Sequence, residues 1–241
     1  MRPPNVSIRV DPRRVFRWQC MLIAALLGLH LAVGLPALLA GHDRLLGARR
    51  LFDLRVEANV PTFFSALTLL AAGIAAAMLA AAGAGKPRRW VVTWIGVAAV
   101  FVFGAVDEAA QIHEHAGSLV RETLRTSGPF YFAWILPYGL AAAVGAVLAY
   151  PALASLGDDS RRSIVWGVSL AVMGAIGIEM IQGCLWTTRG ATVGQTPLNF
   201  VLATAEEMLE LFGSAYLLRG LLTGLAERLG DSVLLLRVGT P

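Results

Sequence analysis

The sequence predicts an all-α membrane protein, a polytopic bundle of about six transmembrane helices in one domain. Hydrophobic residues make up 56% of the chain and charged residues only 15%, whereas soluble domains carry roughly 25% charged residues. The mean hydropathy is positive, at +0.65. Six segments reach or approach the length of about 20 mostly apolar residues that crosses a bilayer. These three observations exclude an ordinary soluble domain.

The first three expected spans have clear limits. The first, 18–40, follows three arginines and is longer than the apolar core of a signal peptide, so we expect it to be a retained helix. The second, 59–85, is rich in alanine and ends in a Gly-Lys-Pro turn. The third begins at Trp90 and stays uncharged until Asp107.

The last three expected spans contain the unusual residues. The fourth, 130–156, follows a Ser-Gly-Pro turn and is followed by Gly-Asp-Asp-Ser. The fifth, 163–188, contains one glutamate, and the sixth, 197–218, contains three with apolar sequence on both sides. Small residues in these spans allow membrane helices to approach closely. They therefore favour a compact bundle over a wide aqueous pore.

The basic residues indicate an orientation. With the N-terminus in the cytoplasm, thirteen of the twenty Lys and Arg fall on the cytoplasmic side, the side that carries the excess in membrane proteins. We therefore expect a bacterial inner-membrane protein with both termini cytoplasmic. Its parts are a basic tail at 1–17, a transmembrane domain at 18–222 and a second tail at 223–241.

The net charge and the cysteines of the chain point to no function. The net charge is only +4 and no basic run is interleaved with aromatic residues, so we expect no nucleic-acid partner. The two cysteines, Cys20 and Cys184, both lie in apolar runs, and nothing in their spacing calls for a disulfide.

Ionisable residues gather in the outer half of the predicted bundle, and this asymmetry is the most informative feature of the sequence. Such residues are costly in a membrane, so they mark a site or a pathway. They are Glu57, Asp107, Glu108, His113, Glu114, His115, Glu179, Glu206, Glu207 and Glu210. Carboxylates at close range in a low dielectric cannot all ionise without a compensating charge. Bound protons, loop arginines or a metal ion would each supply it.

Helical spacing sorts the residues at the end of the third span. At about 100° per residue, one group shares a single arc, whereas His113 points to the opposite side if the helix stays regular. The residues on the shared arc are Asp107, Glu108, Gln111, Glu114 and His115. This spacing therefore favours His115 as the histidine of the site.

Four motifs resemble those of a family of uncharacterised polytopic bacterial inner-membrane proteins. They are E-x-N-x-P-T-x-x-S at 57–65, D-E-x-x-x-x-H-E at 107–114, Glu179 in a glycine-rich helix, and E-E-x-x-E at 206–210. The resemblance spans roughly residues 50–220 and implies a fold but no activity. It makes His113 the matched histidine, against the helical arc. A helix that unwinds after about Gln111 would reconcile the two.

The preferred hypothesis is a metal-dependent membrane enzyme whose carboxylate/histidine site opens to the outer side and acts on a lipid-like or quinone-like substrate. The expected cofactor is a divalent metal ion, with di-iron and zinc as candidates. The candidate ligands are Glu57, Glu108, His113 or His115, Glu114, Glu179, Glu207 and Glu210. Asp107 and Glu206 would carry protons or hold the ligands in place, and are the candidate catalytic residues.

Two alternatives remain open. The same carboxylates would serve a proton- or cation-coupled transporter, or the acidic cluster would dock a partner of a non-catalytic membrane assembly subunit. A solvated helix end would explain the charges near His113 without any site. Outside the cluster, we expect His30 to be a satisfied buried histidine, and Trp134 with Pro137 to be an interface anchor and a kink. Asn59 would either cap its helix or bind a carboxylate.

Overall fold

The computed structural model describes residues 10–40 and 47–230, and all regular structure in these ranges is helical. Much of both predicted tails lies outside the described residues, at 1–9 and 231–241, as does the segment 41–46. The elements in chain order are α1 (Pro12–Ala40), α2 (Ala48–Phe52), α3 (Val60–Ala81), α4 (Arg88–Ala110), α5 (Ile112–Leu124), η1 (Gly128–Phe130), α6 (Ile135–Ala154), α7 (Asp158–Val172), the π-helix η2 (Met173–Ile178), α8 (Glu179–Arg189), η3 (Gly190–Gln195) and α9 (Pro197–Leu229).

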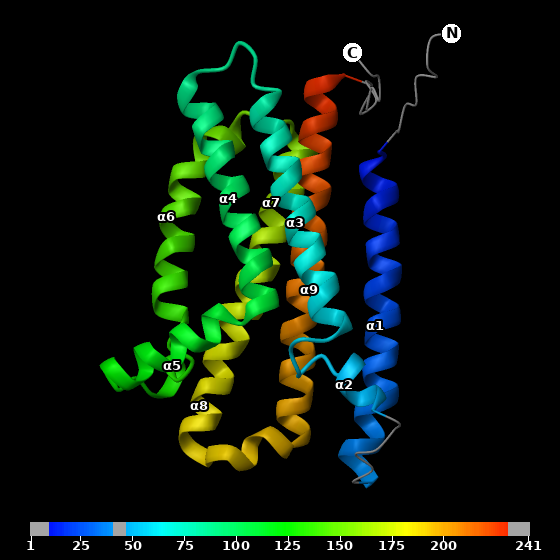
Figure 1. Cartoon of the computed structure of the whole chain (residues 1–241), viewed down its shortest axis with the longest axis vertical. Coiled ribbons are helices and arrows are strands. Elements are labelled where there is room, and N and C mark those ends of the chain that lie inside the picture. Colours follow the sequence, from blue (N-terminus) through cyan, green and yellow to red (C-terminus); the bar gives the residue numbers. More distant parts are fainter. Residues whose placement is uncertain (1–9, 41–46, 231–241) are drawn as a thin grey trace.

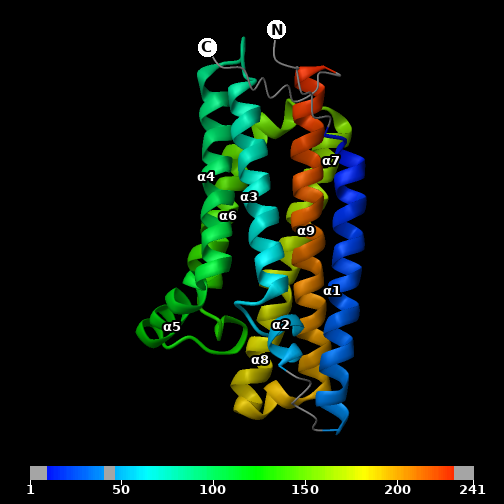
Figure 2. The ribbon, with the colours of Figure 1, turned by 45° about the vertical axis from the view of Figure 1, so that its right-hand side comes forward.

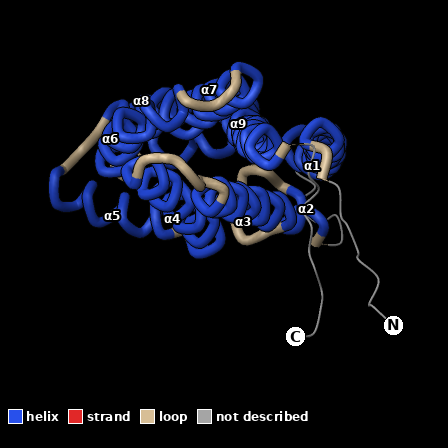
Figure 3. The backbone as a smooth tube through the Cα atoms, turned by 90° about the horizontal axis from the view of Figure 1, so that it is seen from above, coloured by secondary structure: helices blue, strands red, loops and turns tan. Residues whose placement is uncertain are grey.

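The long helices run side by side as a bundle (Figure 1). Seen from above, they form two rows, with α6, the α7–α8 rod, α9 and α1 in one row and α4 and α3 in the other (Figure 3). Helix α1 begins and α9 ends at the same end of the bundle, and the short helices α2 and α5 lie toward the opposite end. We call that opposite end the α5 end. Helix α5 projects sideways from it (Figure 2).

The described chain contains five helices that are long and apolar enough to cross a membrane. They are α1, α3, α4, α6 and the continuous rod from Asp158 to Gln195. Helix α9 runs beside them over 33 residues and carries three glutamates in its first half. The protein is therefore a multi-pass membrane protein, and the predicted all-α membrane bundle is confirmed.

Local sequence explains where the helices begin. Asn59 caps α3, because its side-chain oxygen accepts hydrogen bonds from the backbone N–H and the hydroxyl of Thr62, each at 3.1 Å. Thr196 caps α9 in the same way through the N–H of Asn199 at 3.2 Å. Each cap is followed by a proline in the first turn, where no N–H is needed. The capping alternative for Asn59 is thus correct.

The rod and α9 approach closely through glycines, as the small-residue content predicts. A Cβ at Gly167 would lie only 2.7 Å from the backbone oxygen of Gly213, and one at Gly174 only 2.9 Å from that of Glu206. These glycines bring the rod against the glutamate-bearing part of α9. Cys20 and Cys184 are both free thiols.

Several helix limits differ from those expected. Helix α1 begins at Pro12, six residues before Trp18, and α9 continues to Leu229. Helix α6 begins at Ile135, because residues 128–130 form a separate turn. Pro137 therefore sits in the first turn of α6, where proline is tolerated, and the expected kink there is wrong.

Candidate carboxylate–histidine site

A buried ionic network fixes the loop that carries Glu57. Asp53 is fully buried and accepts hydrogen bonds from Arg55 Nε at 2.9 Å, Arg55 Nη2 at 2.8 Å and Arg49 Nε at 3.1 Å. Burial alone would raise the pKa of Asp53, but the neighbouring His30 ring and the hydrogen bonds and charge of Arg55 hold it well below its usual range. Asp53 is thus an anion at neutral pH, and its hydrogen bonds fasten the loop before Glu57.

His30 completes this network and is not a candidate ligand. Its ring is fully buried, accepts the N–H of Leu54 at Nδ1 over 3.0 Å, and pairs at Nε2 with the hydroxyl of Thr204 over 2.9 Å. The ring also stacks on Phe200 at 4.9 Å between centroids. Both ring nitrogens are occupied, so the expectation of a satisfied buried histidine is confirmed.

The chain unwinds at Gln111, and this break decides which histidine joins the site. Gln111 adopts the left-handed conformation, with φ 56°, between the end of α4 and the start of α5. His113 therefore turns back toward α4: its backbone N–H donates to Asp107 Oδ1 at 2.7 Å, and its Nδ1 lies 3.1 Å from Asp107 Oδ2. The regular-helix arc that favoured His115 is wrong, because the helix is not regular there.

His115 points elsewhere. It is exposed, and its Nδ1 contacts the backbone oxygen of Gln111 at 2.7 Å. A charged helix end facing solvent describes this residue well. It does not describe His113 or Asp107, whose side chains are only 17% and 12% exposed.

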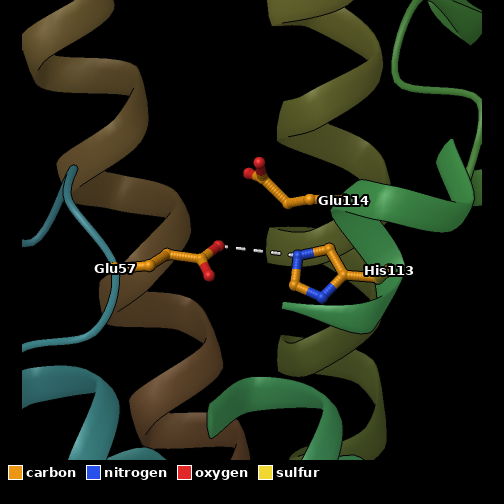
Figure 4. Close-up of side chains that lie close together, drawn as sticks. All are labelled: Glu57, His113 and Glu114. Carbon is orange, nitrogen blue, oxygen red and sulfur yellow. Dashed lines mark ion pairs between the residues drawn. The ribbon is translucent and has the colours of Figure 1, made fainter. Parts of the chain in front are cut away.

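Glu57, His113 and Glu114 come together from two separate segments of chain (Figure 4). Their ligand atoms all lie within 4.8 Å of one another, and in the part of the chain that the structure describes no other trio of His, Cys, Asp or Glu does so. Glu57 Oε1 lies 3.6 Å from His113 Nε2. The other oxygen of Glu57 is buried without a hydrogen-bond partner in the described chain. We call these three residues the triad.

The electrostatics of the triad favour a positive charge at its centre. Burial alone would lower the pKa of His113, but the ion pair with Glu57 and the negative charges of Asp107 and Glu114 raise it to about 9. Because Asp107 accepts the Nδ1 proton, Nε2 is the nitrogen that faces Glu57. In the protein alone, an imidazolium therefore supplies the cation that the carboxylates attract.

Five further glutamates on α4, α8 and α9 continue the acidic region from the triad. We call them the inner glutamates: Glu108, Glu179, Glu206, Glu207 and Glu210. Glu207 has Glu108, Glu206, Glu57 and Glu179 as its electrostatic neighbours. Gln182 donates a hydrogen bond to Glu206, and one oxygen of Glu179 is buried without a partner among the described residues. The structure thus gathers the predicted acids into one region, but the inner glutamates are not part of the compact trio.

Three residues that contact the site were not predicted from the sequence as site residues. Tyr138 donates its hydroxyl to Asp107 at 3.0 Å, and the Trp134 ring meets His113 edge-on at 5.3 Å between centroids. Gln182 holds Glu206. The interface-anchor interpretation of Trp134 is therefore incomplete, because this residue packs against the histidine of the site. Tyr and Trp are common at membrane interfaces, so their residue types gave no signal.

The chain belongs to a known family. Residues 19–225 match the family described as Domain of unknown function (DUF8692). No curated protein and no solved structure matches the chain. Membership agrees with the resemblance to an uncharacterised family.

Proposed function

We propose that this member of the DUF8692 family is a metal-dependent membrane enzyme that acts on a lipid-like substrate at the outer side of a bacterial inner membrane. The observation that carries the proposal is the triad, whose ligand atoms lie within 4.8 Å of one another. One imidazole with two carboxylates is a donor set that Zn²⁺ and first-row metals such as iron accept. The unpartnered oxygen of Glu57 fits this use, since a metal would satisfy it.

The surroundings of His113 support a ligand role. A metal-binding histidine commonly donates its other N–H to a carboxylate, which fixes the ring and raises its basicity. Asp107 occupies that position, and Tyr138 in turn donates to Asp107. A bound metal would polarise a carbonyl or phosphoryl oxygen, or activate a water. The inner glutamates would then accept or relay the released proton.

Metal analysis with paired histidine variants tests the proposal. The purified protein should contain a stoichiometric divalent metal, and His113→Ala should lose it, because Nε2 of His113 is a ligand. His115→Ala is the matched control and should keep it, since His115 faces away from the triad. Glu57→Gln against the exposed Glu122→Gln repeats the comparison for a carboxylate. The metal centre would be refuted if the wild-type protein contained no metal after incubation with metal. It would also be refuted if His113→Ala and His115→Ala lost metal equally.

A proton- or cation-coupled carrier is the second candidate. The inner glutamates favour it, because they extend the acidic region from the triad across α4, α8 and α9 as far as Glu210. Chelation and pH separate the two functions. A metal-held cluster should melt lower with chelator at neutral pH and recover when metal returns. A cluster held by protons alone should ignore chelator and lose stability as the pH is raised.

The compartment is tested by topology. Reporter fusions after Lys86 and after Arg162 should be cytoplasmic, and fusions near Arg49 and Arg121 should be external. The proposal rests on the basic residues of the sequence. The reverse pattern would move the site to the cytoplasmic side.

A further inference from the structure

The middle of α6 is exposed around its whole circumference. All nine residues from Leu140 to Leu148 are exposed, and the most apolar part of α6 is 11% buried, against 44% for α3. A helix that packs in a bundle buries at least one stripe of residues spaced three and four apart. Along this stretch, α6 buries none.

Both ends of α6 are nevertheless anchored. Toward the α5 end, Ile135 is buried and Tyr138 donates its hydroxyl to Asp107 of α4. At the other end, Ala152 is buried, and Ser155 accepts a 2.8 Å hydrogen bond from the indole of Trp90. The helix is therefore held in place beside α4 (Figure 1), and its exposed middle is not the result of a detached helix.

The unpacked part lies on the stripe of α6 that faces the bundle. Tyr138, Ala142, Gly145, Ala149 and Ala152 are spaced four, three, four and three residues apart, so they share one face of the helix. Tyr138 and Ala152 make contacts with the bundle, whereas Ala142 and Gly145 between them are exposed. A Cβ at Gly145 would meet no atom within 4 Å.

Helix α4 shows the matching gap. Asp107, Phe103, Val100 and Gly96 share one face of α4 by the same spacing, and the Phe103 ring lies 6.3 Å from that of Tyr138. Val100 is 65% exposed, and a Cβ at Gly96 would again meet nothing within 4 Å. We call Gly96 and Val100 of α4, with Ala142 and Gly145 of α6, the open stripe.

We propose that the open stripe holds the hydrocarbon chain of one membrane lipid, whose head group lies at the triad. The stripe contains only small or apolar side chains, and hydrocarbon is what surrounds such residues in a bilayer. Toward the α5 end the stripe reaches Tyr138, whose hydroxyl donates to Asp107, and Asp107 in turn contacts His113. A lipid chain in the stripe would therefore bring its polar end to the site.

The gap on this face of α6 is long enough for the hydrocarbon of one leaflet. The contacts at its two ends, Tyr138 and Ala152, are fourteen residues apart, which is about 21 Å along a helix. The hydrocarbon core of a bilayer is about 30 Å thick, so one leaflet contributes about half of that. The inference rests on the proposed function for the identity of the lipid as substrate, but the binding of the chain is independent of any metal.

Two tryptophan variants on opposite sides of α6 test the inference. Gly145→Trp fills the open stripe, and Val147→Trp places the same side chain on the outward face, where Val147 is 74% exposed. The purified proteins are delipidated in detergent, and the lipid that remains bound is counted by native mass spectrometry. Each is also labelled in vesicles with a phosphatidylglycerol that carries a photoreactive diazirine on its acyl chain, and the labelled peptides are mapped.

We expect one retained lipid in the wild type and in Val147→Trp, with label concentrated at 96–100 and 142–145. Retention by Gly145→Trp should fall about tenfold or more, the factor that corresponds to losing contact with about two methylene groups. Metal content is measured on the same samples: lipid retained without metal would refute the proposed enzyme but support the lipid site. The proposal would be overturned if the wild type retained no lipid or if the label were spread evenly around α6. It would also be overturned if a Gly145→Cys variant formed disulfide-linked dimers through position 145 that the wild type, with its free Cys20 and Cys184, does not form.

Discussion

Replacing Asp53 by asparagine removes a charge at the centre of the network that fastens the loop of Glu57. The substitution keeps the shape of the side chain but removes the carboxylate that Arg55 and Arg49 both contact. Asp53 is fully buried, and the Arg55 and Arg49 side chains are 14% and 32% exposed. Removing one partner of a buried pair costs about 3–5 kcal/mol of unfolding free energy. Because water partly reaches both arginines, we expect the lower limit, about 3 kcal/mol.

This loss has a measurable thermal consequence. A chain of this size loses about 2–4 °C in Tm for each kcal/mol, so Asp53→Asn should melt about 6–12 °C below the wild type. Melting is followed in detergent at pH 7 by the fraction of monodisperse protein after heating. The pKa of Asp53 lies below its usual range, so its stabilisation is present above about pH 4 and is lost as the pH falls further. The two melting temperatures should therefore converge on acidification.

Asp158→Asn is the matched control. Asp158 also pairs with an arginine, Arg161, but its side chain is 80% exposed. Surface pairs of this kind contribute little, and the control should melt within about 3 °C of the wild type. Equal shifts for the two variants, or a gap that persists at low pH, would show that the Asp53 network does not stabilise the fold in the way described.

Three further results follow from the site and the packing. In metal-free protein, the pKa of His113 is raised to about 9, so its stabilisation of the fold is complete below about pH 6.5 and is lost as the pH rises through 9. The melting temperature of His113→Ala should therefore change less with pH than that of the wild type. Parallel curves of melting temperature against pH would contradict this. Gly167→Ala should lower the free energy of unfolding by about 1–3 kcal/mol, because the new methyl group would clash with Gly213. Gly28→Ala, where the methyl group meets open space, should raise it by about 0.5–1 kcal/mol. A higher melting temperature for Gly167→Ala than for Gly28→Ala would speak against the close packing. Gln111→Gly should be tolerated, because glycine accepts the left-handed conformation. Gln111→Val should lower both the melting temperature and the metal content, because a β-branched residue does not. If Gln111→Val changed neither, the break between α4 and α5 would not be required.

The fold class was readable from the sequence because apolar length alone decides whether a helix can cross a bilayer. The finer limits were not. Residues 12–17 extend α1 although three of them are arginines, and a separate turn at 128–130 delays the start of α6. Both depend on local backbone geometry, which hydropathy does not describe.

The acidic residues of the candidate site were predictable, but their arrangement and their uncharged neighbours were not. The cost of charge in a membrane pointed to the acidic residues, and the structure gathers them. The choice between His113 and His115 depended on the left-handed conformation of Gln111. Glycine and asparagine commonly adopt this conformation at a helix end, and glutamine does not, so the sequence could not predict it. Tyr138 and Asp107 meet across 31 positions of sequence, a pairing that only the packing of α4 against α6 creates.

The π-helical segment Met173–Ile178 has a consequence at the level of the gene. It directly precedes Glu179, and its wider turns hold more residues than an α-helix would over the same rise. Deleting a single codon within it would remove the extra residue and leave a plain α-helix, with the residues downstream on nearly the same face. Deleting a codon in α7 would instead turn everything downstream by about 100° relative to what lies upstream. Glu179 and Gln182 would then swing away from α9 although neither had been altered. In-frame deletions should therefore be tolerated within Met173–Ile178 but not in the α-helix that precedes it.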